Sequence, residues 1–367
     1  MKRTAKRWVI TFVCLQLAVL VAIAGLVVYI DPFFHYHAPF LSQFFYALDD
    51  ADQRSQNEGI LKHFDYNAII TGSSMTANFK TSQMDELFGV KSIKVPFFGA
   101  SFKEVSDALS RTLSYNPDVQ IVVRSLDLPY FLLDPHELRT DLGTYPTYFY
   151  NNNPFDDVNY LFNRSVMLKE ILPMLGYSLA GGEPGITDFD SYSNRMEYHT
   201  FGPKTVLGTR GTYLPPTEIN KLTDEQRTMI KENVSLHLTS LAEQYPDITF
   251  YYFFTPYSAA WWGSTYQSGN LEQEIELEKI AIEEMLNYDN IHLFSFSTFF
   301  DITTDLNNYL DTTHYADWIN EDLLRFMKEG TGLLTEENYQ AYLEQEYEFY
   351  KTFDYNSLFD QVDDPNY

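Results

Sequence analysis

The chain has 367 residues and a formal net charge of −26, which excludes nucleic acid as an expected partner, because phosphate neutralisation needs clustered lysine and arginine. Hydrophobic residues make up 45% of the sequence, enough for a sizeable core in one large α/β domain that carries insertions. Cys14 is the single cysteine, so no disulfide can form within one chain.

The amino terminus has the pattern of a membrane anchor. Met1–Trp8 is rich in lysine and arginine, and Val9–Ile30 follows without a charged residue. Because a bilayer span needs about 20 apolar residues, this run predicts a single-pass helix in the cell membrane. The basic flank predicts a cytoplasmic amino terminus with the rest of the chain outside the cell.

A cleaved signal peptide is the alternative, because Ala22-Ile23-Ala24 resembles a cleavage site. The apolar run is long for a signal core, which favours an uncleaved anchor. An exported chain without disulfides indicates a bacterial surface, more specifically a Gram-positive one.

The juxtamembrane segment, residues 31–64, begins with an aromatic and polar stretch. Asp31–Tyr46 has the composition of an interfacial collar, where aromatic rings lie at the level of the lipid headgroups. His35 and His37 form a His-x-His pair, but no carboxylate or cysteine cluster stands beside them, so we predict no metal site. Asp49–His63 is expected to form a helix that leads into the first strand.

Residues 65–330 alternate between strand patterns and helix patterns. Such alternation predicts an α/β domain with a five-stranded parallel sheet and helices on both faces. The expected strands are Asn67–Thr71, Lys91–Val95, Val119–Arg124, Ile248–Phe254 and Ile291–Phe294. The expected helices are Thr81–Phe88, Phe102–Tyr115, Asp224–Gln244, Leu271–Leu286 and Ala316–Lys328.

Two segments depart from this alternation. Residues 129–216 are rich in proline, glycine, asparagine and tyrosine, and so long a segment without periodicity indicates a functional insertion. Residues 331–367 contain one more expected helix, Glu336–Thr352, and a tail from Asp354 that we expect to be loose.

The end of the first strand presents a candidate nucleophile. Ala68, Ile69 and Ile70 form a short apolar run that breaks at Gly72, which is typical of a buried strand that ends in a tight turn. Ser74 follows at the carboxyl end of the strand, where α/β sheets bind their ligands. The alternative is an ordinary strand-to-helix turn in which a serine caps the helix.

A candidate base lies near the other end of the chain. Asp311 and His314 are three residues apart, just before the expected helix at 316–328. A histidine that deprotonates a serine needs a partner that fixes its tautomer and stabilises the imidazolium. The sequence therefore supplies nucleophile, orienting acid and base in the order Ser74, Asp311, His314. The alternative is a solvated aspartate and a helix-capping histidine.

These stretches resemble the sequence blocks of the SGNH (GDSL-type) hydrolase superfamily. Gly72-Ser73-Ser74-Met75 resembles the first block, with Ser73 where the family usually has aspartate and Ser74 at the position of the nucleophile. Asp311-Thr312-Thr313-His314 resembles the last block. The resemblance spans roughly residues 60–330 and implies an SGNH-type, flavodoxin-like three-layer sandwich preceded by one transmembrane helix.

The oxyanion hole is only partly covered by the resemblance. Val95–Ser101 resembles the second block, whose glycine is here Gly99 and contributes a backbone N–H to the hole beside that of Ser74. The third block, Gly-x-Asn-Asp, is not recognisable after the third strand, so one oxyanion donor stays unassigned.

Four residues at strand ends are candidates for substrate binding. Asp127 follows the third strand, and Tyr257 and Ser258 follow the fourth. Trp261 comes just after them and could stack on a sugar ring or roof a cleft. Simple packing under the insertion is an equally good interpretation of the tryptophan, and Asp127 could hold a backbone amide instead of a substrate group.

The constellation predicts an acyl-serine mechanism without a cofactor or a metal, and either water or a hydroxyl can accept the acyl group. The closest resemblance is to the membrane-anchored branch that includes the D-alanyl transfer protein of lipoteichoic acid modification and polysaccharide O-acetylation proteins. It implies an extracytoplasmic acyltransferase or esterase that acts on acetyl or D-alanyl groups of a cell-surface polymer or glycan. It also implies a membrane-bound O-acyltransferase as partner. The alternative is a non-catalytic surface or glycan-binding protein that keeps the fold.

Overall fold

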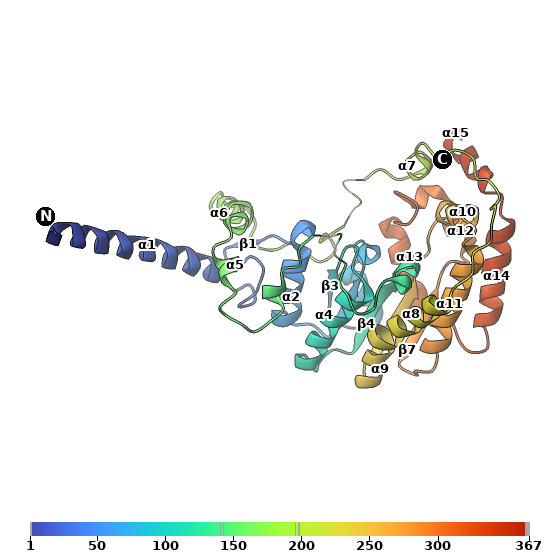
Figure 1. Cartoon of the computed structure of the whole chain (residues 1–367), viewed down its shortest axis with the longest axis horizontal. Helices are drawn as coiled ribbons and strands as arrows, with labels where there is room; N and C mark the ends of the chain where they lie inside the picture. Colours follow the sequence, from blue (N-terminus) through green and yellow to red (C-terminus); the bar gives the residue numbers. More distant parts are fainter. Residues whose placement is uncertain (1, 140, 142, 195, 197–198, 364–367) are drawn as a thin grey trace. The chain divides into compact units, whose positions relative to one another are not determined.

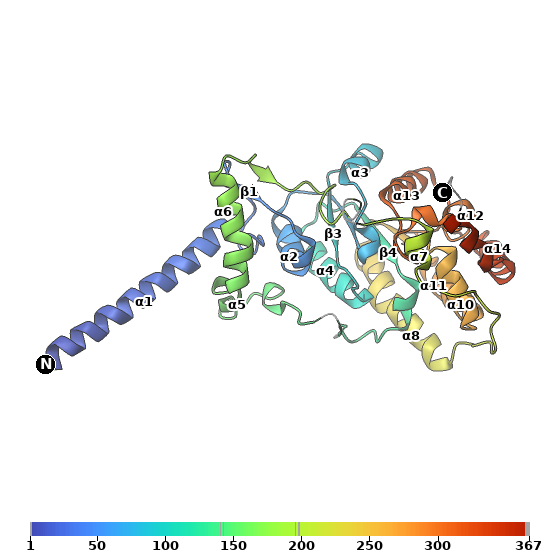
Figure 2. The ribbon, with the colours of Figure 1, turned by 90° about the horizontal axis from the view of Figure 1, so that it is seen from above.

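The chain divides into two compact units, each assembled from two stretches of the sequence. Unit 1 contains Met1–Phe64 and Thr144–Asp188, and unit 2 contains Asp65–Gly143 and Phe189–Tyr367. The segment 129–216, expected as one insertion, is thus shared between the units. Figures 1 and 2 show the elements of both units. The computed structural model describes residues 2–139, 141, 143–194, 196 and 199–363.

Unit 2 is built on a five-stranded parallel sheet, which confirms this part of the predicted fold. The strand order is β3-β2-β4-β6-β7, and every neighbouring pair is parallel. Every residue of β2 and β3 is buried, as is usual in parallel sheets, which are covered on both faces. The strands are β2 (Ala68–Gly72), β3 (Ser92–Pro96), β4 (Ile121–Leu126), β6 (Thr249–Phe254) and β7 (Ile291–Ser295).

The strand order creates a switch point between β2 and β4. From β2 the chain first adds β3 on one side, and it then adds β4, β6 and β7 on the other. Thr71 of β2 pairs with Arg124 of β4, and the Ser73 amide donates to the Ser125 hydroxyl at 3.2 Å. The two strands therefore end side by side, where open α/β sheets form their ligand crevices.

Most helices of unit 2 occupy the predicted positions, and one long predicted helix is interrupted. The segment 224–244 forms α8, a π-helical stretch (Ser235–Thr239) and α9. The longer helices are α3 (Thr81–Phe88), α4 (Phe102–Tyr115), α8 (Asp224–Val234), α11 (Leu271–Met285), α13 (Asp317–Glu329) and α14 (Tyr339–Thr352). The shorter ones are α7 (Pro203–Leu207), α9 (Ser240–Gln244), α12 (Phe300–Thr303) and α15 (Asp360–Asp363).

Helix α10 (Ala259–Gln267) was not expected from the sequence. Its residues include the weak helix formers glycine, serine, threonine and several aromatics, so its propensity is low. Tertiary packing supports the helix instead. A side chain at Gly263 would lie 2.6 Å from the Tyr213 ring, so the close approach of that ring requires glycine.

The prediction of a loose tail after Asp354 is wrong for the residues that the structure describes. Tyr355–Phe359 forms a 3₁₀ helix and α15 follows it. Tyr355 and Leu358 are buried, and Asn356 exchanges hydrogen bonds with the backbone of Tyr213 at 2.9 and 3.2 Å. The buried Tyr355 and Leu358 side chains and the Asn356 amide therefore hold a segment whose terminal position predicted disorder.

Unit 1 joins the amino-terminal segment to residues 144–188. The parallel pair of β1 (Phe45–Tyr46) and β5 (Gly185–Ile186) links the two stretches. The helix expected at 49–63 is present as a 3₁₀ turn (Asp50–Asp52) followed by α2. The remaining helices are α1 (Lys2–Ile30), α2 (Gln53–His63), the 3₁₀ turn Thr147–Phe149, α5 (Val158–Leu161), the π-helical stretch η5 (Val166–Ile171) and α6 (Leu172–Leu179).

A buried carboxylate organises the collar of unit 1. Asp31 has a positive φ of 48° and accepts backbone N–H groups of His35, Tyr36 and His37 at 2.7–3.0 Å. The Tyr160 hydroxyl donates to it at 2.8 Å, from a position far along the chain. The imidazoles of His35 and His37 contact Asp157 and the Val28 carbonyl respectively, so the two rings do not converge on one point.

Helix α1 is long and apolar enough to cross a membrane by length and composition. Of its residues, Val27 and Ile30 at the carboxyl end are buried by unit 1 itself. Cys14 lies in the exposed part of the helix.

Candidate active site

The turn after β2 displays Ser74. Gly72 ends the strand with φ 137°, and a side chain there would meet the Ser125 hydroxyl at 2.2 Å, so only glycine fits. The Ser73 hydroxyl accepts the Met75 amide at 3.2 Å and caps the 3₁₀ turn Ser74–Thr76. The serine that caps the turn is therefore Ser73, and the hydroxyl of Ser74 is free of this capping role.

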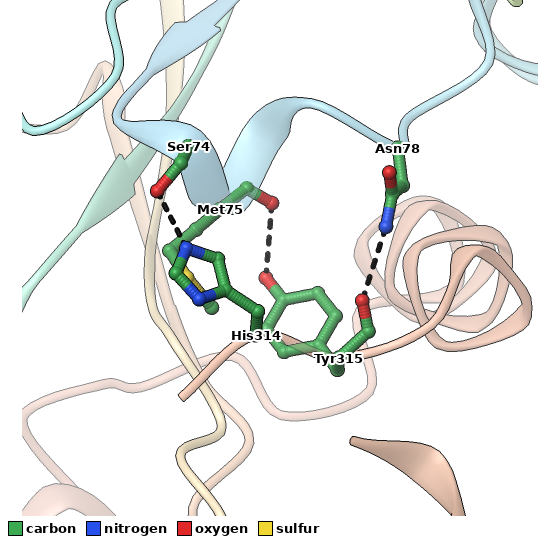
Figure 3. A pocket seen from close by; sticks show the side chains of 5 residues that line it. All are labelled: Ser74, Met75, Asn78, His314 and Tyr315. Atoms are coloured by element: carbon green, nitrogen blue, oxygen red, sulfur yellow. Dashed lines mark hydrogen bonds between the residues drawn. The ribbon is translucent and has the colours of Figure 1, made fainter. Parts of the chain in front are cut away.

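Ser74, His314 and Asp311 form a continuous hydrogen-bonded chain. The Ser74 hydroxyl lies 2.8 Å from Nε2 of His314 (Figure 3), and Nδ1 of His314 lies 2.7 Å from the Asp311 carboxylate. Because a carboxylate only accepts, Nδ1 carries the proton, and Nε2 of the neutral ring is free to accept from Ser74. The predicted meeting of these three side chains is present.

The tight turn itself holds Asp311 ionised. Oδ1 of Asp311 accepts the backbone N–H groups of Thr313 and His314, both at 2.8 Å, and the Thr313 hydroxyl at 3.1 Å. Burial alone would raise the pKa of Asp311, but the hydrogen bond and charge of His314 and the two amides outweigh it and hold the pKa well below 3.8. The carboxylate is therefore available to stabilise an imidazolium.

Direct hydrogen bonds tie the histidine turn to the serine turn. The Asn78 amide donates to the Tyr315 carbonyl at 3.1 Å, and the Asn320 amide donates to the Met75 carbonyl at 3.2 Å. The Tyr315 hydroxyl reaches the same Met75 carbonyl at 3.4 Å (Figure 3). A cavity of about 10 Å³, roughly the space of one water molecule, is lined by Ser74, Met75, Asn78, His314 and Tyr315.

Two backbone N–H groups are candidate oxyanion donors. Within the described part of the chain, the amides of Ser74 and Gly99 have no hydrogen-bond acceptor. Gly99 adopts φ 67° in the loop after β3, and the Phe97 amide ties this loop to the Gly72 carbonyl at 2.8 Å. Nη1 of Arg139 donates to the Gly99 carbonyl at 2.7 Å, a contact that sequence reasoning did not identify.

Asp127 lies deep at the end of β4 and is 4% exposed. The Tyr257 hydroxyl donates to it at 2.8 Å. Burial raises the pKa of Asp127, although hydrogen bonds from Ser73 and Tyr257 and the charge of His314 act to lower it. Asp127 therefore stands behind the Ser73–Ser74 turn with its partners inside the protein.

The segment after β6 braces the histidine turn. The backbone amide and the hydroxyl of Ser258 both donate to the Thr312 carbonyl, at 3.1 and 2.7 Å. The Tyr309 hydroxyl donates to the Pro256 carbonyl at 2.7 Å. Three of the four residues predicted to bind substrate are buried: Asp127, Tyr257 and Ser258. The fourth, Trp261, is partly exposed, and its ring centroid lies 4.8 Å from that of Tyr257. Their role in substrate binding stays a prediction.

Among the described residues, no group of three or more histidine, cysteine, aspartate or glutamate side chains is placed to hold a metal ion.

Neither a protein-family model nor a curated protein matches the sequence. One similar solved structure is a chain from Streptococcus pneumonia described as a proposed platelet activating factor. It is 11% identical, with a TM-score of 0.38, over 77% of the present chain and 92% of its own.

Proposed function

We propose that this protein is a serine-dependent acyl transfer enzyme, an O-acyltransferase or an esterase, with Ser74 as nucleophile. The hydrogen-bonded chain from Ser74 through His314 to Asp311 carries this proposal. Ser74 lies 240 residues before His314 in the chain, whereas Asp311 and His314 are three residues apart, and the proton is on the ring nitrogen that faces the acid. Nucleophilic serines are activated by an adjacent base that is oriented by a third group.

The reaction proceeds through an acyl-serine. His314 Nε2 takes the Ser74 proton as Oγ bonds to the acyl carbon, and the carbonyl oxygen becomes an oxyanion. The amides of Ser74 and Gly99 are the proposed donors to this oxyanion, and losing one such donor typically costs about 10²–10³ in rate. Collapse expels an alcohol, which takes the proton from His314. Water or a second hydroxyl then attacks the acyl-serine and gives its proton to His314. When the bond from the acyl carbon to Ser74 Oγ breaks, His314 returns this proton to Oγ, and an acid or a new ester is released.

The fold proposed for unit 2 is the three-layer sandwich of the SGNH superfamily. Numbered within the sheet, the strand order is 2-1-3-4-5, as in flavodoxin-like sheets. Right-handed crossovers then place α3 on one face of the sheet and the helices that follow β3, β4 and β6 on the other. In this arrangement Ser74 stands at the ligand crevice of the switch point.

The proposed substrate is an O-acyl group, acetyl or D-alanyl, of a cell-surface polymer or glycan. Helix α1 carries lysine and arginine in its first turns, before its apolar part, which supports a single-pass anchor with unit 2 outside the cell. A membrane-bound O-acyltransferase is the proposed partner, since an extracytoplasmic transferase needs a supply of acyl groups from the cytoplasm.

A fluorophosphonate probe tests the proposal directly. We expect an adduct on Ser74, located by mass spectrometry, and no adduct in the Ser74→Ala variant. Ser73→Ala is the matched control, because Ser73 caps the turn but does not contact His314, so labelling should persist. An adduct on Ser73 instead would identify Ser73 as the nucleophile, one residue before the proposed one.

A non-catalytic, glycan-binding surface protein is the second candidate. The absence of a recognisable third SGNH block after β4 favours it, because Asp127 stands there with its hydrogen bonds inside the protein. If the folded protein with its native Ser74 forms no adduct and cleaves no acyl ester, this candidate replaces the enzyme.

A further inference from the structure

Unit 1 exposes large apolar side chains outside α1 as well as within it. Phe155 and Leu179 are each 85% exposed, although both lie in a segment that packs on the unit. Soluble surfaces rarely expose contiguous apolar patches of this kind unless they dock on something. The exposed apolar residues of the segment are Phe155, Val158, Phe162, Leu168, Leu172, Tyr177 and Leu179.

Three of these residues form a row along one helix face. Leu168, Leu172 and Leu179 lie on the continuous helical stretch 166–179, four and seven residues apart, which places them on the same side. Leu175, half-buried, fills the gap in this leucine row. The inward side is buried and consists of Val166, Glu170, Ile171 and Met174. The stretch therefore has two largely apolar sides, one buried within unit 1 and the other exposed.

The leucine row belongs to the part of unit 1 that surrounds the end of α1. Both α5 and η5 contact α1, and Figures 1 and 2 show α6 beside the end of α1 that is opposite the amino terminus. Burial of Val27 and Ile30 places this packing at the last turns of the helix. The helical stretch that carries the row therefore lies beside the carboxyl end of α1 within one unit.

The length of α1 locates the membrane surface at this end. A span of about 20 residues at about 1.5 Å per residue that begins at Val9 ends near Val28. Around Val28 the collar supplies aromatic and polar groups: Nε2 of His37 bonds the Val28 carbonyl at 2.8 Å, and the rings of Tyr29 and Phe40 lie 5.6 Å apart. Aromatic rings at this level are typical of a membrane–water interface.

Charge favours lipid as the occupant of this surface. Arg164 and Lys169 are exposed on the same helical segment, in a chain whose net charge is −26. Interfacial helices combine an apolar side with basic residues that approach anionic headgroups.

We propose that the leucine row is a second membrane contact, which lies in the outer interfacial layer of an anionic bilayer beside the α1 span. The helical stretch 166–179 then lies along the membrane, with its apolar side immersed about 5–10 Å. Unit 1 is held to the membrane at two places and has a fixed orientation on it. This contact goes beyond the proposed chemistry and does not depend on Ser74.

Depth-dependent fluorescence quenching tests this contact in the full-length chain. Single cysteines are introduced by Leu172→Cys or Leu179→Cys in a Cys14→Ser background, labelled with a fluorophore and reconstituted into phosphatidylglycerol-containing nanodiscs. Brominated lipids carry the quencher either near the headgroup or near the chain end. We expect strong quenching of both labels by the shallow bromines and weak quenching by the deep ones.

Two controls frame the result. Leu214→Cys is the matched control. Leu214 is also an exposed leucine, with 61% of its surface accessible, but it lies in unit 2, outside α1 and the leucine row. A label at this position should keep its fluorescence. The native Cys14 in α1 should be quenched by the deep bromines. Labels at 172 and 179 that behave like the one at 214 would overturn the proposal. The proposal would also be overturned if the labels were shielded from water in native membranes but not in lipid nanodiscs. A partner protein would then cover the row.

Discussion

Two aspartates of the candidate site have opposite surroundings. Asp311 lies on the partly exposed turn that carries His314, and its carboxylate accepts three N–H groups: two backbone amides and Nδ1 of the ring. Asp127 lies at the buried end of β4, where hydroxyl groups are its partners. Burial acts to raise both pKa values, yet donors and charge reverse the direction for Asp311 and not for Asp127. At Asp311 the hydrogen bond and charge of His314 and two backbone amides outweigh burial, whereas burial prevails at Asp127.

The two carboxylates therefore have different roles in the proposed mechanism. Asp311 contacts the ring that moves the proton, so it orients His314 and stabilises its charged form. Asp127 supports the Ser73–Ser74 turn from behind and stays outside the path of the proton. The same substitution, aspartate to asparagine, is therefore a matched test at the two positions.

The largest expected effect is on the rate of acyl transfer in Asp311→Asn. An amide at this position can donate to Nδ1 of His314, which favours the tautomer whose Nε2 carries a proton and cannot accept from Ser74. In the serine protease triad the equivalent change costs about 10⁴ in kcat. We expect a loss of this order with measurable residual activity, read from hydrolysis of a chromogenic acyl ester.

Asp127→Asn is the matched control for this measurement. Its carbonyl oxygen still accepts from Tyr257, so we expect activity within about tenfold of the native chain, equivalent to about 1.4 kcal/mol in the barrier. Equal losses at both positions would show that Asp127 belongs to the proton path, and the proposed division of roles would fail.

The pH dependence of stability should separate the same two residues with opposite signs. The folded-state pKa of Asp311 is depressed, so its contribution is present above 3.8 and is lost as the pH falls toward the folded value. The folded-state pKa of Asp127 is raised, so its ionisation weakens the fold as the pH rises above 3.8.

Thermal unfolding of the two asparagine variants checks these signs. Relative to the native chain, Asp311→Asn should be least stable near neutral pH, and its deficit should shrink in acid. Asp127→Asn should gain on the native chain as the pH rises above 3.8, until the folded carboxyl is also ionised. Parallel curves for the two variants would contradict the comparison.

Local patterns were sufficient to predict the sheet and the chemical core of the site. Apolar runs such as Ile69–Ile70 that break at glycine fixed the strand ends, and Asp311 and His314 lie on one turn that the sequence itself displays. The partner of that turn could be named because a serine at a strand end is a local signal too.

Contacts between distant segments could not be predicted. Asn78 and Asn320 join the serine and histidine turns across more than 200 residues, and an isolated asparagine gives no periodic signal. Asp31 pairs with Tyr160 across 129 positions, which assigns residues 144–188 to the amino-terminal unit. The buried tail around Tyr355 was missed because residues near a terminus are usually poorly ordered, and nothing local shows that Asn356 pairs with the backbone of Tyr213.

The smallest expected effect concerns the brace behind the histidine turn. In Ser258→Ala the hydroxyl that donates to the Thr312 carbonyl at 2.7 Å is lost, but the backbone amide of residue 258 still donates to the same oxygen. The hydroxyl also caps α10 by accepting from the Trp261 amide at 3.4 Å, but that amide still donates to the Ser258 carbonyl at 2.9 Å. Because no buried group is left unpaired, the cost should be about 0.5–2 kcal/mol of unfolding free energy, the range for losing a hydrogen bond or an N-cap. The turn keeps its other fastening, from Tyr309 to the Pro256 carbonyl, so the Ser74–His314 contact should persist and the rate should fall only slightly. Urea unfolding and ester hydrolysis, measured on the same preparation, check both parts. A rate loss approaching that of Asp311→Asn would mean that the Ser258 hydroxyl controls the position of His314, and the segment after β6 would then rank with Asp311 in orienting the base.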